Sequence, residues 1–121
     1  MTAPTLPDWT EVRAALAKAM GERILVLDGA MGTMLQRLKL GEDDFRGERF
    51  RDWNRPLQGN NDLLVLTRPE AVEEIHFQYF MAGADIVETN TFSATSVAQA
   101  DYGTESAVYD INYQGVVVAR R

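Results

Sequence analysis

Apolar residues recur three and four positions apart in three stretches of the chain, and this spacing is typical of helices with one buried face. The first stretch covers residues 8–21, where Asp8 or Thr10 can cap the helix before a glycine ends it. The second covers residues 67–83 and has a proline near its first turn, a favoured position for proline. The third covers residues 107–120. The pattern therefore predicts a leading helix and two further helices in the second half of the chain.

Shorter apolar runs lack the helical spacing and favour strands. Residues 24–27 (Ile-Leu-Val-Leu) and 85–88 (Asp-Ile-Val-Glu) are too short for helices, and the first shows no alternation, as expected of a parallel strand buried on both faces. Residues 63–66 fit either a strand or a turn packed by its leucines. Short helices are possible over residues 33–39 and 93–100. The order of strand, helix, strand and helix predicts a parallel α/β sheet with right-handed crossovers.

The connection between residues 40 and 61 has neither period, and it mixes many charged residues with Phe45, Phe50 and Trp53. A structureless connection of this length is uncommon inside a compact domain and is often functional. The charges favour a solvated surface, whereas the aromatic side chains indicate that the connection packs onto something.

Two strands cannot complete a sheet of this kind, because a two-stranded parallel piece leaves apolar faces and unpaired edges that need neighbours. The chain has 121 residues, enough for one domain at most. The sequence therefore predicts a piece of a larger α/β domain. Its leading helix would occupy residues 1–21, and the first strand-helix units would occupy residues 22–121.

Composition and charge exclude several classes of function. Lys and Arg number 12 against 18 Asp and Glu, which gives a net charge of −6 and argues against a protein that binds nucleic acid through phosphate contacts. With no cysteine and one histidine, a cysteine-based zinc site, a thiolate nucleophile and a histidine-rich metal cage are not expected within this chain. No apolar run approaches the ~18 residues of a membrane span, and no signal peptide is evident, so we expect a cytoplasmic protein that does not bind membranes.

Candidate chemistry gathers where the two predicted strands end. Asp28-Gly29-Ala30-Met31-Gly32 follows the first strand, at the carboxyl end where parallel α/β proteins place ligand groups. Asp28 can accept hydrogen bonds from an ammonium, and the glycines let an anionic group approach backbone N–H groups. Glu88, Thr89 and Asn90 end the second strand and suit a small polar ligand. Each stretch alone fits a capped turn as well, but their common position at one rim favours a binding site.

The single histidine, His76, lies in the helix predicted over residues 67–83. A lone histidine beside apolar residues favours a ring packed at the helix edge, because a metal site needs two or three partners. We therefore assign His76 no ligand.

Four stretches of the sequence resemble one family. They are Leu27-Asp28-Gly29-Ala30-Met31-Gly32-Thr33, Asp44-Phe45-Arg46-Gly47-Glu48-Arg49-Phe50, Gly59-Asn60-Asn61-Asp62-Leu63-Leu64 and Ala82-Gly83-Ala84-Asp85-Ile86-Val87-Glu88-Thr89-Asn90-Thr91-Phe92. The first and last are similar to motifs found broadly in homocysteine S-methyltransferases. The middle two resemble more specifically the cobalamin-dependent methionine synthases. Together the stretches span about residues 22 to 120 and resemble the N-terminal part of the homocysteine-binding domain of that family.

The resemblance implies a (β/α)8 barrel, of which this chain would hold a leading helix and about two of the eight strand-helix units. It implies that homocysteine lies at the carboxyl rim, with its thiolate on a zinc ion that three cysteines of later strands carry. Methylcobalamin on another domain would supply the methyl group, with methyltetrahydrofolate as its source, and methionine would form. Without cysteines and without the later strands, the chain alone is expected to hold neither zinc nor cobalamin and to be inactive.

Residue by residue, Asp28, Gly29 and Thr89 match positions that contact the amino-acid end of homocysteine, and Glu88 and Asn90 are neighbours carried over with them. No catalytic residue and no metal ligand is assigned within the chain. The implied partners are homocysteine, the remainder of the barrel, and the cobalamin and folate domains. Two alternatives stay open: a free-standing α/β module that binds an anionic metabolite through residues 28–32, and an interaction protein whose open sheet edge pairs with a second copy or a complementary chain.

Overall fold

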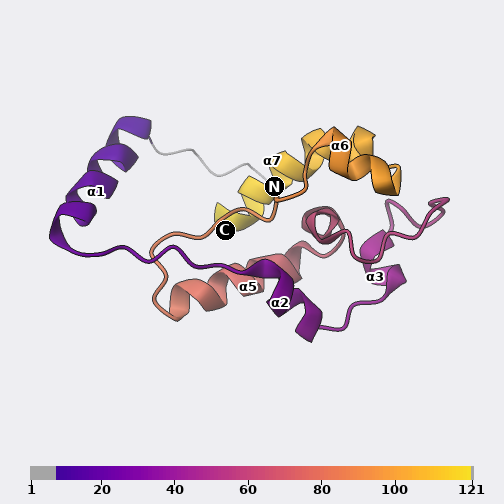
Figure 1. Cartoon of the computed structure of the whole chain (residues 1–121), viewed down its shortest axis with the longest axis horizontal. Coiled ribbons are helices and arrows are strands. Elements are labelled where there is room, and N and C mark those ends of the chain that lie inside the picture. The colour runs from indigo at the N-terminus through magenta and orange to yellow at the C-terminus, as the bar shows by residue number, and fades with distance from the viewer. Residues whose placement is uncertain (1–7, 121) are drawn as a thin grey trace.

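A computed structural model describes residues 8–120 of the chain, and it is dominated by helices (Figure 1). In chain order its elements are α1 (Trp9–Glu22), α2 (Met31–Arg37), α3 (Glu42–Arg46), the 3-10 turn η1 (Asn61–Leu63), α4 (Leu64–Thr67), α5 (Pro69–Met81), α6 (Ser96–Gln99), the 3-10 turns η2 (Ala100–Tyr102) and η3 (Glu105–Ala107), and α7 (Val108–Arg120).

The predicted α/β fold class is wrong for this structure. Of the residues described, 61% are helical and 2% are strand, and they form no sheet. The two predicted strands do run side by side in the parallel sense, but a single bridge, between Leu27 and Ile86, is all that joins them as β structure. An N-terminal piece of a (β/α)8 barrel built from strand-helix units is therefore contradicted.

The physical reason lies in what surrounds these two segments. A parallel strand is stabilised by neighbours on both edges and by helices on both faces. Here the first run lies open to solvent, and Ile24 is 89% exposed. An apolar run of four residues without cover reaches neither the pairing nor the burial that its composition predicts.

Polar contacts hold the two segments together instead. The Arg23 guanidinium donates to both carboxylate oxygens of Asp85, at 2.9 and 2.6 Å, and the Val26 N–H donates to the same carboxylate at 2.9 Å. The hydrogen bonds from Arg23 and the Val26 N–H lower the pKa of Asp85 to about 2. The N–H of Asp28 then donates to the carbonyl oxygen of Ile86 at 3.1 Å. These contacts bring the two predicted strand ends to one place.

The three helices predicted from periodicity are confirmed. In α1 the Asp8 carboxylate accepts the Thr10 N–H at 2.9 Å, as expected of a capping residue. Helix α5 begins at Pro69, and α7 covers nearly the whole range predicted for it. The open question over residues 63–66 is settled in favour of helical structure, because these residues form the end of η1 and most of α4.

The short helix α4 lies at the centre of the core. Leu64 and Val65 are fully buried there, and α4 contacts α3, α5 and α7. The hydrophobic core consists of Leu35, Phe45, Phe50, Leu57, Leu63, Leu64, Val65, Val72, Ile75, Ala94, Ala107, Ile111 and Val118. The long helices α5 and α7 therefore pack around the short helix α4. This position buries residues 63–66, whose apolar composition also fits a strand.

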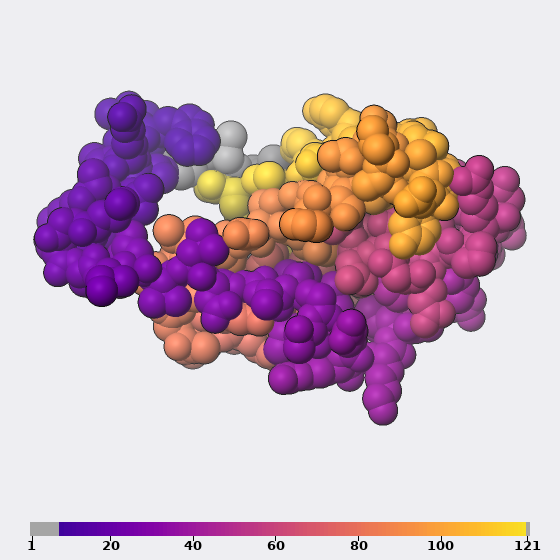
Figure 2. All heavy atoms as spheres, viewed as in Figure 1, coloured from indigo at the N-terminus to yellow at the C-terminus, as the bar shows by residue number. Residues whose placement is uncertain are grey.

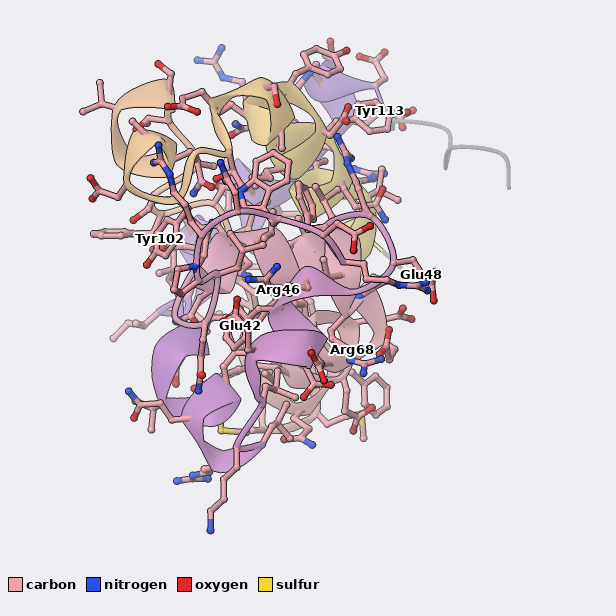
Figure 3. All side chains as sticks on the ribbon, turned by 90° about the vertical axis from the view of Figure 1, so that its right-hand side faces the viewer. Glu42, Arg46, Glu48, Arg68, Tyr102 and Tyr113 are labelled. Atoms are coloured by element: carbon pink, nitrogen blue, oxygen red, sulfur yellow. The ribbon has the colours of Figure 1, made fainter. Side chains whose placement is uncertain are left out.

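The Glu42–Arg46 ion pair holds several backbone groups of the long connection after α2. Glu42 and Arg46 lie side by side on α3 (Figure 3), with Arg46 Nε 2.9 Å from Glu42 Oε1. Arg46 also donates to the carbonyl oxygens of Trp53 and Arg55, and Glu42 accepts the N–H groups of Leu57 and Gln58. Burial raises the pKa of Glu42, but the two N–H donors and Arg46 outweigh burial and lower it.

The aromatic residues of this connection confirm that it packs onto the molecule. Phe45 and Phe50 are buried, and Trp53 lies edge-on to Phe50 with ring centroids 5.2 Å apart. The indole N–H of Trp53 donates to the carbonyl oxygen of Tyr102 at 2.9 Å. The connection thereby carries residues 59–62 to a fixed position beside the second half of the chain.

Helix α1 stands to one side of the other helices (Figures 1 and 2). None of its residues is buried, and its apolar side chains Trp9, Val12, Leu16 and Met20 all remain exposed. Arg23, directly after the helix, ties it to Asp85. The apolar stripe of α1 is therefore a face without cover in this structure.

Candidate functional site

A cavity of about 610 Å³ opens where four segments meet: residues 27–32, 59–62, 88–93 and 98–102. All five residues that the sequence analysis assigns to a binding site line this cavity. They are Asp28, Gly29, Glu88, Thr89 and Asn90. The structure thus brings the two predicted stretches together although it does not form the predicted sheet, because the Arg23–Asp85 contacts replace the ladder in holding them side by side.

The first stretch enters the cavity as an exposed turn. Asp28 Oδ1 accepts the N–H of Gly29 at 2.9 Å, so one carboxylate oxygen caps the turn. Gly29 lies close to the second stretch, since a Cβ there would be 3.4 Å from the Cβ of Val87. A small residue at position 29 therefore lets the two stretches approach, which agrees with the turn reading and leaves the second Asp28 oxygen for a ligand.

The floor of the cavity is built by Asn60, Asn61 and Asp62, which sequence reasoning quoted only as part of a motif. Each of them bonds to the segment that follows Glu88. Asn60 exchanges two amide hydrogen bonds with Gln99, at 2.8 and 3.1 Å. The Asn61 carbonyl oxygen accepts from Asn90 Nδ2 at 2.9 Å, and the Asp62 carboxylate accepts the N–H of Ser93.

Gln99 completes this network from inside the molecule. Its Nε2 donates to the carbonyl oxygen of Ser93 at 3.0 Å, and its Oε1 accepts from the Thr104 hydroxyl at 2.7 Å. Asn60, Gln99 and Thr104 are all buried. A buried polar network in which each member has a partner is rigid, so Ser93 is held from both its N–H and its carbonyl sides. No local pattern marks Gln99, because Asn60, its partner in the cavity floor, is 39 residues away in the sequence.

Thr89 lies on a turn backed by α7. Its hydroxyl is 2.7 Å from the hydroxyl of Thr91, and the Thr91 N–H donates to the Thr89 carbonyl oxygen at 2.9 Å. Gly115 of α7 packs directly behind this turn. The position of Thr89 in the cavity wall therefore depends on how closely α7 approaches.

A family model described as homocysteine S-methyltransferase matches residues 25–121. The chain belongs to the homocysteine S-methyltransferase family. Enzymes of this family transfer a methyl group to homocysteine, their substrate. The match includes every segment that lines the cavity.

The wall of this methyltransferase-family cavity is acidic. Four carboxylates line it, those of Asp28, Asp62, Glu88 and Asp101, and within the described residues no lysine or arginine does. Burial raises the pKa of Asp62 above its ordinary value. The acidic wall favours a ligand that carries a positive group, such as the ammonium of an amino acid. It disfavours the alternative reading of a module for anionic metabolites.

The family's implied zinc does not fit the residues present. The chain has no cysteine, and across residues 8–120 no three or more His, Asp or Glu side chains lie together as metal ligands.

The prediction of a packed His76 ring is confirmed, because the residue is 2% exposed and lies on α5, outside the cavity lining. Among the described helices, none is both long enough and apolar enough to cross a membrane.

Proposed function

We propose that the chain is part of the homocysteine-binding domain of a cobalamin-dependent methionine synthase. It would hold homocysteine for methyl transfer from methylcobalamin, with methyltetrahydrofolate as the methyl source and methionine as the product. The family match supports methyl transfer to homocysteine. The resemblance of the two middle motifs, Asp44 to Phe50 and Gly59 to Leu64, supports the cobalamin-dependent branch within the family. One observation carries the site: the five residues assigned from sequence line a single cavity of about 610 Å³.

In this proposal the acidic wall receives the amino-acid end of homocysteine. Asp28 accepts the ammonium through the oxygen that does not cap its own turn, and the Thr89 hydroxyl contacts the same end of the substrate. Glu88 extends the negative charge at the rim. Asn90 has its side-chain amide on Asn61, so we assign it a positioning role rather than a direct contact.

The chain would bind homocysteine without activating its thiol. Thiol activation in this proposal needs thiolate ligands for zinc, and this sequence contains no cysteine. We therefore assign no metal-dependent catalytic step to these residues, and we expect the chain alone to be inactive.

The exposed apolar residues identify where further protein would pack. The α1 stripe and Ile24 offer apolar surface of the kind that contacts other domains or chains. We propose that the other domains of a methionine synthase cover these faces. Association with a second copy is the rival outcome, and light scattering over a range of protein concentrations separates the two.

Titration calorimetry with homocysteine tests the proposed function. We expect the parent chain to bind homocysteine and Asp28→Asn to bind it about tenfold to a hundredfold more weakly, since a charge-assisted hydrogen bond is worth ~1.5 to 3 kcal/mol. Asn keeps the turn capped, so folding should be preserved. Asp52→Asn, an exposed residue outside the cavity, is the matched control for net charge. Equal affinities of parent and Asp28→Asn would remove Asp28 from the site.

A further inference from the structure

Asp62 stands out among the residues of the cavity because its carboxylate is buried without a compensating charge. The residue is 4% exposed and lines the cavity floor at the start of η1. Its one side-chain partner among the described residues is the N–H of Ser93, which donates to Oδ2. Among residues 8–120, Asp62 forms no ion pair, whereas Asp44, Asp85 and Asp110 each form an ion pair with an arginine.

The second oxygen of Asp62 remains reachable from the cavity. Within residues 8–120, two side-chain polar atoms are buried from solvent without a hydrogen-bond partner. Both are ring nitrogens of His76. Oδ1 of Asp62 has no hydrogen bond in the structure and yet is not among them. It is therefore open to the cavity that the residue lines. One oxygen fixes the wall, and the other faces the space where a ligand would lie.

A buried carboxylate in this state costs folding free energy, because burial removes its hydration and a single N–H replaces little of it. The cost is reduced when a cation enters the cavity and pairs with the free oxygen. The side-chain amides of Asn60 and Asn90 donate to Gln99 and Asn61 instead of to Asp62, and an amide carries no charge that could balance the carboxylate. A ligand that carries a cationic N–H donor can supply the missing charge.

We propose that Asp62 is a binding residue for the primary ammonium group of the substrate, acting from the cavity floor together with Asp28 at the rim. The inference rests on the proposed function and adds a second, buried carboxylate to the substrate site. An ammonium has three N–H donors, so it can bond to two carboxylates at once. The buried partner contributes the larger share because its surroundings screen charge less.

A metal ion is the less suitable occupant of this position. Across the described residues no three potential ligand side chains lie together, and Asp62 is flanked by amides that are already paired. A single carboxylate oxygen is a weak metal site but a good acceptor for one N–H of an ammonium. The chemistry therefore favours small amines, and amino acids among them.

The test uses three ligands and three proteins in titration calorimetry. The ligands are homocysteine, 4-mercaptobutanoate, which lacks the amine, and 3-mercaptopropan-1-amine, which lacks the carboxylate. The proteins are the parent, Asp62→Asn and Asp52→Asn. Asparagine at position 62 can still accept the Ser93 N–H, so the wall is retained. Asp52→Asn removes an exposed carboxylate outside the cavity and serves as the matched control for net charge.

We expect Asp62→Asn to weaken both amine ligands about tenfold to a hundredfold. The amine-free 4-mercaptobutanoate should bind Asp62→Asn as well as the parent or better, and Asp52→Asn should leave all three affinities close to those of the parent. Thermal unfolding distinguishes a purely structural residue: Asp62→Asn should be as stable as the parent or more stable, because it removes a buried charge. A loss of stability with unchanged preference for amines would overturn the inference.

The outcomes separate this inference from the proposed function. If homocysteine binds and Asp62→Asn binds it equally well, the Asp62 role fails while the proposed function stands. A second outcome is that the parent binds 3-mercaptopropan-1-amine but not homocysteine, and that Asp62→Asn binds neither. The proposed function then fails while the Asp62 role stands. If neither amine binds the parent, both fail.

Discussion

The approach of α7 to the Thr89–Thr91 turn allows one substitution to be predicted in detail. Gly115 is buried in α7, and a Cβ built on it would lie 2.6 Å from Thr91 Cγ2 and 4.0 Å from Thr89 Cβ. A contact of 2.6 Å is far shorter than van der Waals distance, so something has to move. We predict that Gly115→Ala destabilises the protein and displaces Thr89 from the cavity wall.

Two opposing effects set the magnitude. In an ordinary helix interior, replacing glycine by alanine stabilises by ~0.5 to 1 kcal/mol. Overpacking a filled site costs ~1 to 3 kcal/mol. Thr91 cannot relieve the clash cheaply, because its branched side chain is short and rotating it would break the hydroxyl contact with Thr89. We therefore expect a net loss of about 1 kcal/mol, within a range of about 0 to 2.5 kcal/mol, in the free energy of unfolding.

A double-mutant cycle isolates the contact. Thr91→Ser removes Cγ2 and keeps the hydroxyl that bonds to Thr89, so Gly115→Ala in that background should be neutral or stabilising. The four proteins are compared by urea denaturation followed by far-UV circular dichroism. Gly21→Ala in α1, where a Cβ meets nothing within 4 Å, supplies the propensity effect without a clash.

The reasoning is refuted if Gly115→Ala alone stabilises as much as Gly21→Ala does. It is also refuted if Thr91→Ser fails to rescue the loss, because the clash would then lie elsewhere. Homocysteine titration of the same proteins adds a functional readout, since displacement of Thr89 should weaken binding in Gly115→Ala and restore it in the double variant.

Three further predictions concern the buried His76, the Arg23–Asp85 ion pair and zinc binding. His76→Leu should raise the free energy of unfolding by about 1 to 2 kcal/mol at pH 8, because it removes two buried ring nitrogens without partners. Burial lowers the pKa of His76, so the unfolded chain takes up the proton at a higher pH than the folded protein does. The parent should therefore lose stability as the pH falls below about 6.5. Denaturation at pH 8 and at pH 5.5 should show that His76→Leu lacks this loss. Asp85 has its pKa lowered from 3.8 to about 2, so its contribution is present above about pH 4 and is lost as the pH falls through 2; Arg23→Gln should shift that acid transition upward in a circular dichroism titration. Equilibrium dialysis should find no stoichiometric sub-micromolar zinc site on the chain, and finding one would contradict the assignment of no metal ligand.

Local patterns predicted the elements whose formation depends mainly on local residues. The apolar spacing and the caps located α1, α5 and α7, because a helix closes its hydrogen bonds within one segment. The same patterns failed for residues 24–27 and 85–88. A strand is defined by its partners, and the partners and covering helices that these runs require are absent from residues 8–120.

The candidate site divides in the same way. Asp28, Gly29, Glu88, Thr89 and Asn90 could be chosen from sequence because polar residues directly after apolar runs stand out, and the structure places all five around one cavity. The floor could not be chosen in this way. Asn60, Asp62 and Gln99 look like ordinary loop and helix residues until the fold shows them buried and bonded across it.

The sequence by itself therefore determined the three long helices α1, α5 and α7 and, through its motifs, the family, and it offered a capped turn as one reading of Asp28. Only the tertiary structure decided that the two apolar runs meet through the Arg23–Asp85 pair rather than through a sheet, and that Asp62 is a buried carboxylate without a cation. The reason is physical. Periodicity and capping depend on residues within one or two turns, whereas burial, pairing and the charge balance of a cavity depend on groups that are distant in the sequence and near in space.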